Sequence, residues 1–150
     1  MPGPRVLMVE LLGPFRTAAD DGPVDIRSTR GRALLAALAL APARRVTREG
    51  AAALLWPDRD EAHARACLRQ ELATLRKTLG PHAGILAAST DRIELPPDAP
   101  VSFDVWADLP PPAGPRGTLL EDVDLRTETF EDWRRHQSAA LVARFVAASE

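Results

Sequence analysis

Apolar residues recur at helical spacing in two segments near the start of the chain, each bounded by residues that begin and end helices. The first predicted helix begins near Ser28 or Thr29, whose hydroxyl can accept a bond from a free backbone N–H, and it ends before Pro42. The second begins at Thr47 and ends at the Trp56-Pro57 pair. The pattern therefore predicts two consecutive helices in the first 60 residues.

A third predicted helix is longer and has two different sides. Asp58 or Asp60 can cap its start, and Gly80-Pro81 ends it after Leu79. At about 100° per residue, one side is an apolar stripe formed by Ala64, Leu68, Leu72, Leu75 and Leu79. The outward positions are Ala66, Gln70, Ala73 and Lys77 opposite the stripe, with Arg65, Arg69 and Arg76 on one shoulder. This helix can pack on its own domain and present long polar side chains to a partner.

Strand-forming residues precede the helices. Residues 6–12 are rich in β-forming residues and stop at Gly13-Pro14, so they predict a strand that ends in a turn. Residues 15–17 and 24–26 flank a second turn-like stretch. Together they predict a small antiparallel sheet before the first helix.

A β-hairpin is predicted after the third helix, where residues 85–88 and 92–95 flank the turn residues 89–91. Residues 101–106 are interpreted as either a strand or a short ordered linker. The order of sheet, three helices and hairpin predicts an α+β fold, a winged helix-turn-helix whose hairpin is the wing.

Proline dominates the chain after this region, and residues 109–117 have the composition of a linker. A further helix is predicted from about residue 128 to 148, with Phe130 and Trp133 as apolar anchors. We therefore expect residues 1–106 to fold alone, and residues 107–150 to be a linker and a truncated helical segment. Two interpretations of Phe130 and Trp133 stay open: they pack back onto the winged helix, or they form an exposed patch that docks a partner or further helices, which this division slightly favours.

Composition and charge refine this prediction. Hydrophobic residues make up 45% of the chain and charged residues 27%, as in globular proteins. The net charge is −2, but residues 1–95 hold 14 Arg and Lys against 11 Asp and Glu, and residues 96–150 hold 5 against 10. A basic first part joined to an acidic second part is compatible with a nucleic-acid-facing domain, and equally with an unevenly charged surface.

Membrane insertion, secretion and catalysis are not indicated. The longest apolar run, residues 33–41, is shorter than the roughly 20 residues that a membrane span needs, and no secretory signal opens the chain, so we expect a cytoplasmic protein. The sequence lacks a phosphate-cradling glycine loop, a nucleophile elbow and an H-E-x-x-H motif, so we expect neither an enzyme nor a cofactor. His63 and Cys67 are four residues apart, but zinc needs three or four ligands, so no metal is expected.

Several motifs resemble a known family. The runs RRVTRE (44–49), ALLWPD (53–58), ARACLRQEL (64–72) and LRKTL (75–79) resemble the OmpR/PhoB-type winged helix of SARP-family (antibiotic regulatory protein) activators. Residues 11–15 and 101–106 also match, so the resemblance covers about residues 5–106. Residues 117–121 and 129–134 resemble the beginning of the bacterial transcriptional activation domain of that family, which is built of tetratricopeptide-like helix pairs.

The resemblance implies that residues 62–79 form the recognition helix in the major groove and that residues 85–95 form the wing. Leu68, Leu72 and Leu75 would then be core, and Arg69 and Gln70 would reach base edges. Thr47 and Arg48 would meet phosphate through free N–H groups and charge. The implied DNA-binding residues are Arg65, Arg69, Gln70, Thr74, Lys77, Thr47, Arg48 and Arg92.

These predictions lead to a main hypothesis and an alternative. The main hypothesis is a sequence-specific transcription regulator that binds double-stranded DNA. RNA polymerase or another protein is then a candidate partner of residues 117–150, a homodimer on DNA is a candidate assembly, and no membrane is involved. The alternative is a winged-helix protein-interaction module without DNA contact, which the sequence pI near 5.9 and the small residues Ala66 and Ala73 favour.

Overall fold

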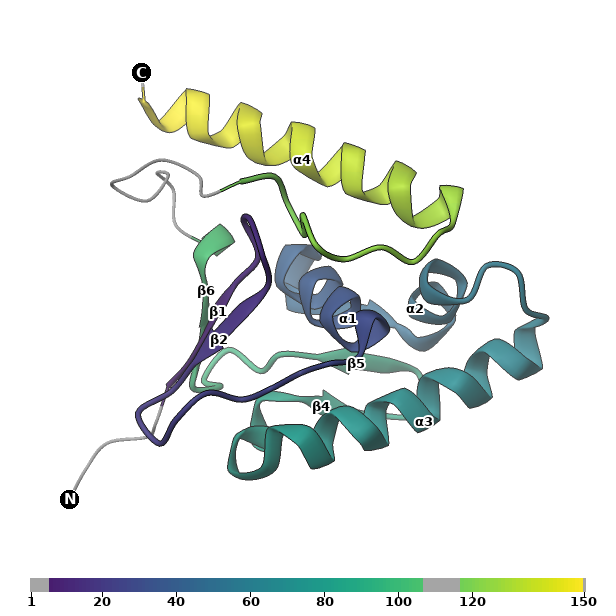
Figure 1. Cartoon of the computed structure of the whole chain (residues 1–150). Helices are drawn as coiled ribbons and strands as arrows, with labels where there is room; N and C mark the ends of the chain where they lie inside the picture. Colours follow the sequence, from purple (N-terminus) through teal and green to yellow (C-terminus); the bar gives the residue numbers. More distant parts are fainter. Residues whose placement is uncertain (1–5, 107–116, 150) are drawn as a thin grey trace.

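The computed structural model describes residues 6–106 and 117–149 and has an α+β fold (Figure 1). Helix α1 (Thr29–Leu40) lies in the centre, α3 (Glu61–Leu79) covers one side and α4 (Glu128–Ser149) the other. The remaining elements are β1 (Leu7–Glu10), β2 (Arg16–Ala18), β3 (Arg45–Thr47), α2 (Arg48–Leu55), β4 (Ala87–Ala88), β5 (Arg92–Glu94), β6 (Val101–Phe103) and the 3-10 turns η1 (Pro42–Arg44), η2 (Gly80–Ile85) and η3 (Asp104–Trp106).

The helix starts follow from side-chain caps, as the sequence predicts. The Ser28 hydroxyl accepts a bond from the N–H of Gly31 at 3.1 Å, and the Thr47 hydroxyl accepts one from Gly50 at 2.9 Å. Asp60, rather than Asp58, caps α3. Each cap satisfies a donor that the first turn of a helix leaves free. The predicted bounds of all three helices are confirmed to within a residue or two.

The N-terminal sheet differs from the prediction in its third strand. β1 pairs antiparallel with β2 as expected, but residues 24–26 stay outside the sheet and β6 pairs parallel with β1 instead. The Thr17 hydroxyl bonds to both the N–H and the carbonyl of Val24, so these backbone groups have a side-chain partner in place of a strand. Asp104, just after β6, accepts bonds from the N–H groups of Leu11 and Leu12 at 2.8 and 3.0 Å. The sheet is therefore mixed rather than antiparallel.

The predicted hairpin is present, and it gains a third strand. β4 and β5 pair antiparallel, and β3 pairs with the other edge of β5 so that Thr47 lies opposite Arg92. Ile85 lies in η2 rather than in the hairpin. β3 joins the hairpin directly to the start of α2, because Thr47 ends the strand and caps that helix.

Residues 117–149 pack on the same core as the winged helix, contrary to the expected boundary at residue 106. Phe130 is fully buried and Trp133 is half-buried, so the expectation of an exposed Phe130–Trp133 patch is wrong. The N–H of Leu120 donates to the carbonyl of Leu11 at 2.8 Å, and the N–H of Phe15 donates to Asp122 at 3.0 Å. The predicted linker falls largely on residues 107–116, outside the described residues. Within residues 6–106 and 117–149, no helix combines the length and apolar character needed to cross a membrane.

Candidate nucleic-acid interface

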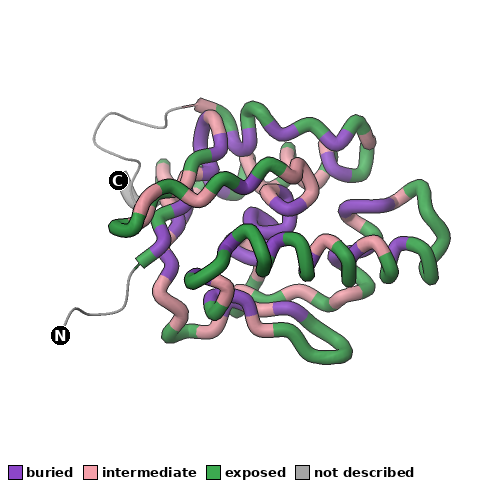
Figure 2. Tube along the Cα trace, turned by 60° about the horizontal axis from the view of Figure 1, so that its bottom comes forward, coloured by how far each residue is buried: buried purple, intermediate pink, exposed green. Residues whose placement is uncertain are grey.

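Helix α3 has the two-sided character that its sequence predicts. All five stripe residues are buried: Ala64, Leu68, Leu72, Leu75 and Leu79. Because these side chains pack inward, the opposite side faces solvent along the whole helix (Figure 2). The exposed positions include each α3 residue predicted to face DNA: Arg65, Arg69, Gln70, Thr74 and Lys77.

Glu71 is the one acidic residue in the body of α3, and it is half-buried at the space that Gln70 and Thr74 also border. It accepts a bond from the hydroxyl of Ser28, which in turn caps α1 through the N–H of Gly31. A Cβ placed on Gly31 would lie 3.1 Å from Oε1 of Glu71, so a larger residue at position 31 would require the Glu71 carboxylate to shift by a few tenths of an ångström. Glu71 therefore fastens α3 to the start of α1, a role that the sequence pattern did not suggest.

Arg48 connects the start of α2 to the turn of the wing. Its backbone N–H donates to the carbonyl of Asp91 at 2.8 Å, and its Nε donates to the carbonyl of Ser89 at 2.6 Å. The wing therefore uses the backbone N–H of Arg48, which is not free for phosphate, whereas the predicted phosphate contacts of Thr47 and of the Arg48 charge stay predictions. The Nη groups of Arg48 make no hydrogen bond within the described part of the chain.

The arginines of α2 and α3 meet at a hollow in the surface. Arg48, Arg65 and Arg69 border a space of about 330 Å³, together with Leu68 and the wing residue Thr90. The structure thus brings three of the predicted DNA-binding residues together. Arg92 is exposed on β5, opposite Thr47, and is not among the residues that border this hollow.

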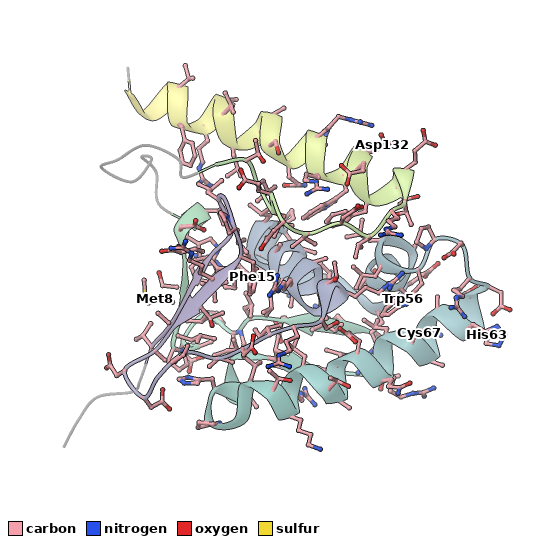
Figure 3. The ribbon with its side chains drawn as sticks, viewed as in Figure 1. Met8, Phe15, Trp56, His63, Cys67 and Asp132 are labelled. Carbon is pink, nitrogen blue, oxygen red and sulfur yellow. The ribbon has the colours of Figure 1, made fainter. Side chains whose placement is uncertain are left out.

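Gln70 and Thr74 belong to a different part of the surface. They border a second space, of about 310 Å³, between α3 and the start of α1, together with Glu71, Trp56 and Cys67. Figure 3 labels Trp56 and, on α3, Cys67. The Nε of Arg30 donates to the carbonyl of Leu55 at 2.9 Å, and its guanidinium lies over the Trp56 ring. Cys67 is half-buried and packs against the core, as expected for a small side chain.

His63 is exposed at the start of α3, where its ring bonds to Asp60 at 2.8 Å. The Asp60 carboxylate accepts this bond and one from the backbone N–H of His63, and these bonds hold the pKa of Asp60 below its usual value. Within the described residues, no group of three His, Cys, Asp or Glu side chains could hold a metal ion. His63 therefore takes part in the local capping of α3.

Helix α4 leaves the exposed side of α3 uncovered. It crosses α1 and α2 on the side away from α3 (Figure 1). Figure 3 shows Asp132 near the start of α4 and His63 near the start of α3, and at this end Thr129 of α4 borders a space together with Glu61 and Arg65 of α3. The candidate interface is therefore defined as the outer side of α3 together with the wing turn.

Comparisons with known proteins give one informative result. No family model and no curated protein sequence matches the chain. Among solved structures, the fold is similar to that of EmbR from Mycobacterium tuberculosis, which was determined in complex with a low-affinity phosphopeptide. The TM-score is 0.68 at 27% sequence identity, over 97% of this chain and 44% of the EmbR chain. The chain thus spans less than half of EmbR, and the likeness supports a SARP-like, α+β fold of winged-helix type.

Proposed function

We propose that this protein is a transcription regulator that binds duplex DNA sequence-specifically, with α3 in the major groove and the β4–β5 wing beside it. The observation that carries the proposal is the contrast between the two sides of α3. Its apolar stripe is buried, whereas its outer side is open and basic. The major groove is about 12 Å wide and admits one helix with its side chains.

The charges on the interface favour a polyanionic partner. Arg27, Arg32, Arg134 and Arg135 each pair with a carboxylate elsewhere on the surface. Within the described part of the chain, by contrast, Arg65, Arg69 and Lys77 have no acidic partner. Cations that the protein itself leaves unneutralised can replace the counterions of DNA phosphates, which supplies much of the affinity in protein–DNA binding.

The likeness to EmbR, a regulator of the SARP family, supports the same proposal. The position of α4 supports it as well, because α4 covers α1 and α2 and leaves α3 accessible. Bound duplex would meet α3, the wing turn and the start of α2 together, which is the geometry of winged-helix recognition.

Gln70 and Arg48 provide a test that separates base reading from phosphate binding. A preferred duplex is first selected from a randomised library with the full chain. Gln70→Ala should then weaken the selected duplex about tenfold and random duplex little, since a bidentate base contact contributes about 1–3 kcal/mol of discrimination. Arg48→Ala should weaken both duplexes equally and make the salt slope shallower by about one unit.

Fluorescence anisotropy at several salt concentrations measures both effects, and Arg135→Ala on α4 serves as the arginine control. Thermal melts accompany the Arg48 variant, because Arg48 also holds the wing turn. Loss of sequence preference in Arg48→Ala, with unchanged preference in Gln70→Ala, would contradict the proposed role of α3.

A further inference from the structure

We infer that the hollow between α2, α3 and the wing turn is a binding site for a single phosphate group. Arg48, Arg65 and Arg69 border it together with Leu68 and the wing residue Thr90. Its volume of about 330 Å³ is roughly ten times the ~30 Å³ that a water molecule occupies in the liquid, so a hydrated phosphate fits. The assignment of this phosphate to a DNA backbone rests on the proposed function. The ability of the three arginines to bind a phosphate group does not rest on it.

The donors around the hollow suit a phosphate. Each guanidinium carries its N–H groups in a planar fork that matches two oxygens of a phosphate. Charge-assisted bonds of this kind are stronger than bonds between neutral groups. No carboxylate borders the hollow, and no acidic residue in the described part of the chain pairs with Arg48, Arg65 or Arg69. A phosphate would therefore supply the missing countercharge.

Arg48 and the helical turn that carries Arg65 and Arg69 are held in place before any ligand binds. The backbone and Nε of Arg48 are both bonded to the wing turn, so its remaining Nη donors extend from a fixed position. Arg65 and Arg69 are one helical turn apart on the same shoulder of α3, and Leu68, which is 1% exposed, anchors that turn in the core. The exposed side chains of Arg65 and Arg69 extend from this anchored turn and become ordered when the phosphate binds.

This placement changes the role of one residue. Arg69, which the sequence pattern assigned to a base edge, lies with Arg48 at the hollow and binds phosphate. Sequence preference then falls to the outer positions of α3, Gln70 among them, which lies outside this hollow. Because the site recognises the phosphate itself, inorganic phosphate also occupies it and competes with duplex DNA beyond the effect of ionic strength.

The direct test is an NMR titration of the full chain with sodium phosphate, with sodium chloride adjusted to keep the ionic strength constant. Phosphate should give saturable shifts at the amides and arginine Nε groups of residues 48, 65, 69 and 90, whereas chloride should not. Arg65→Ala and Arg69→Ala should each weaken phosphate binding about tenfold. Arg76→Ala, an exposed arginine on the same helix that does not border the hollow, should leave it unchanged. Shifts that do not saturate, or that survive both variants, would overturn the site.

A second arm separates free phosphate from backbone phosphate. Arg69→Ala should weaken selected and random duplex by the same factor, and phosphate should displace duplex from the wild-type chain more strongly than chloride of equal ionic strength. If Arg69→Ala instead weakened the selected duplex alone, Arg69 would read a base and the phosphate site would be rejected. Saturable phosphate binding without any duplex binding would support the site and overturn the proposed DNA-binding function.

Discussion

A chain that ends at residue 106 should lose the cooperative thermal unfolding of the full protein. The residues after 116 bury six apolar side chains in the common core: Leu119, Leu120, Val123, Leu125, Phe130 and Leu141. Their removal would expose Leu12 and Phe15 and would leave the N–H of Phe15 without its partner Asp122. Circular dichroism melts of the 1–106 and 1–150 chains measure the difference.

Phe130→Ala tests the same packing in the full chain. Phe130 is fully buried and lies beside Trp133, with ring centroids 5.5 Å apart, so its truncation should cost about 3–5 kcal/mol. That is a large share of the roughly 5–15 kcal/mol that stabilises a typical domain. Val142→Ala on the same helix is the control, because Val142 is 60% exposed and should change the stability by less than about 0.5 kcal/mol. A 1–106 fragment that melts like the full chain would restore the boundary at residue 106.

Reversal of one charge on the outer side of α3 should nearly abolish DNA binding. Lys77 is the chain's only lysine and is exposed on α3, so Lys77→Glu places a carboxylate where the proposed complex has phosphates. Like charges at an interface cost several kcal/mol, so the affinity for duplex should fall about a hundredfold at low salt. A mobility-shift titration measures this loss.

The matched control is Arg135→Glu on α4, which also reverses one exposed cation on a helix. Arg135 pairs with Asp132 on the surface, and an exposed pair of this kind contributes little to stability. Because α4 lies on the side away from α3, this variant should retain most of the wild-type affinity. An equal loss in both variants would mean that net charge, rather than contact through α3, governs binding.

The helices could be predicted from sequence because a few neighbouring residues decide each feature. Ser28, Thr47 and Asp60 cap helices through bonds to N–H groups three residues away. The spacing of Leu68 and Leu72 alone places them on one side of α3, and both are buried. Such local rules hold wherever no distant segment competes with them.

The span of α4 (Glu128–Ser149) was predicted to within a residue, but the third strand of the N-terminal sheet and the packing of α4 were not, because distant residues decide them. β6 pairs with β1 across more than 90 residues, and a parallel partner leaves no turn signal near either strand. The Asp104 carboxylate can accept its bonds from the N–H groups of Leu11 and Leu12 only once β6 has paired with β1. Phe130 is buried because it packs into the core built by earlier residues, which its own helix does not reveal.

The candidate interface could be predicted only in part, because local spacing decides which residues face outward and tertiary contacts decide which of them lie together. Which residues of α3 face outward follows from the helical period, as the exposure of Gln70 and Lys77 illustrates. Which residues surround each arginine does not follow from the helical period, because the wing turn must first fold back onto Arg48. The hollow shared by Arg48 and Arg69 is therefore a product of tertiary structure.

The salt dependence of duplex binding by the full chain tests the central claim most directly. With about four to six phosphate contacts, the logarithm of affinity should fall with the logarithm of salt concentration at a slope near −4 to −5. Between about 50 and 200 mM salt, the affinity should therefore drop roughly 250- to 1,000-fold. Absence of duplex binding at low salt, or an affinity that stays constant across this range, would contradict DNA recognition and favour a winged helix that binds another protein.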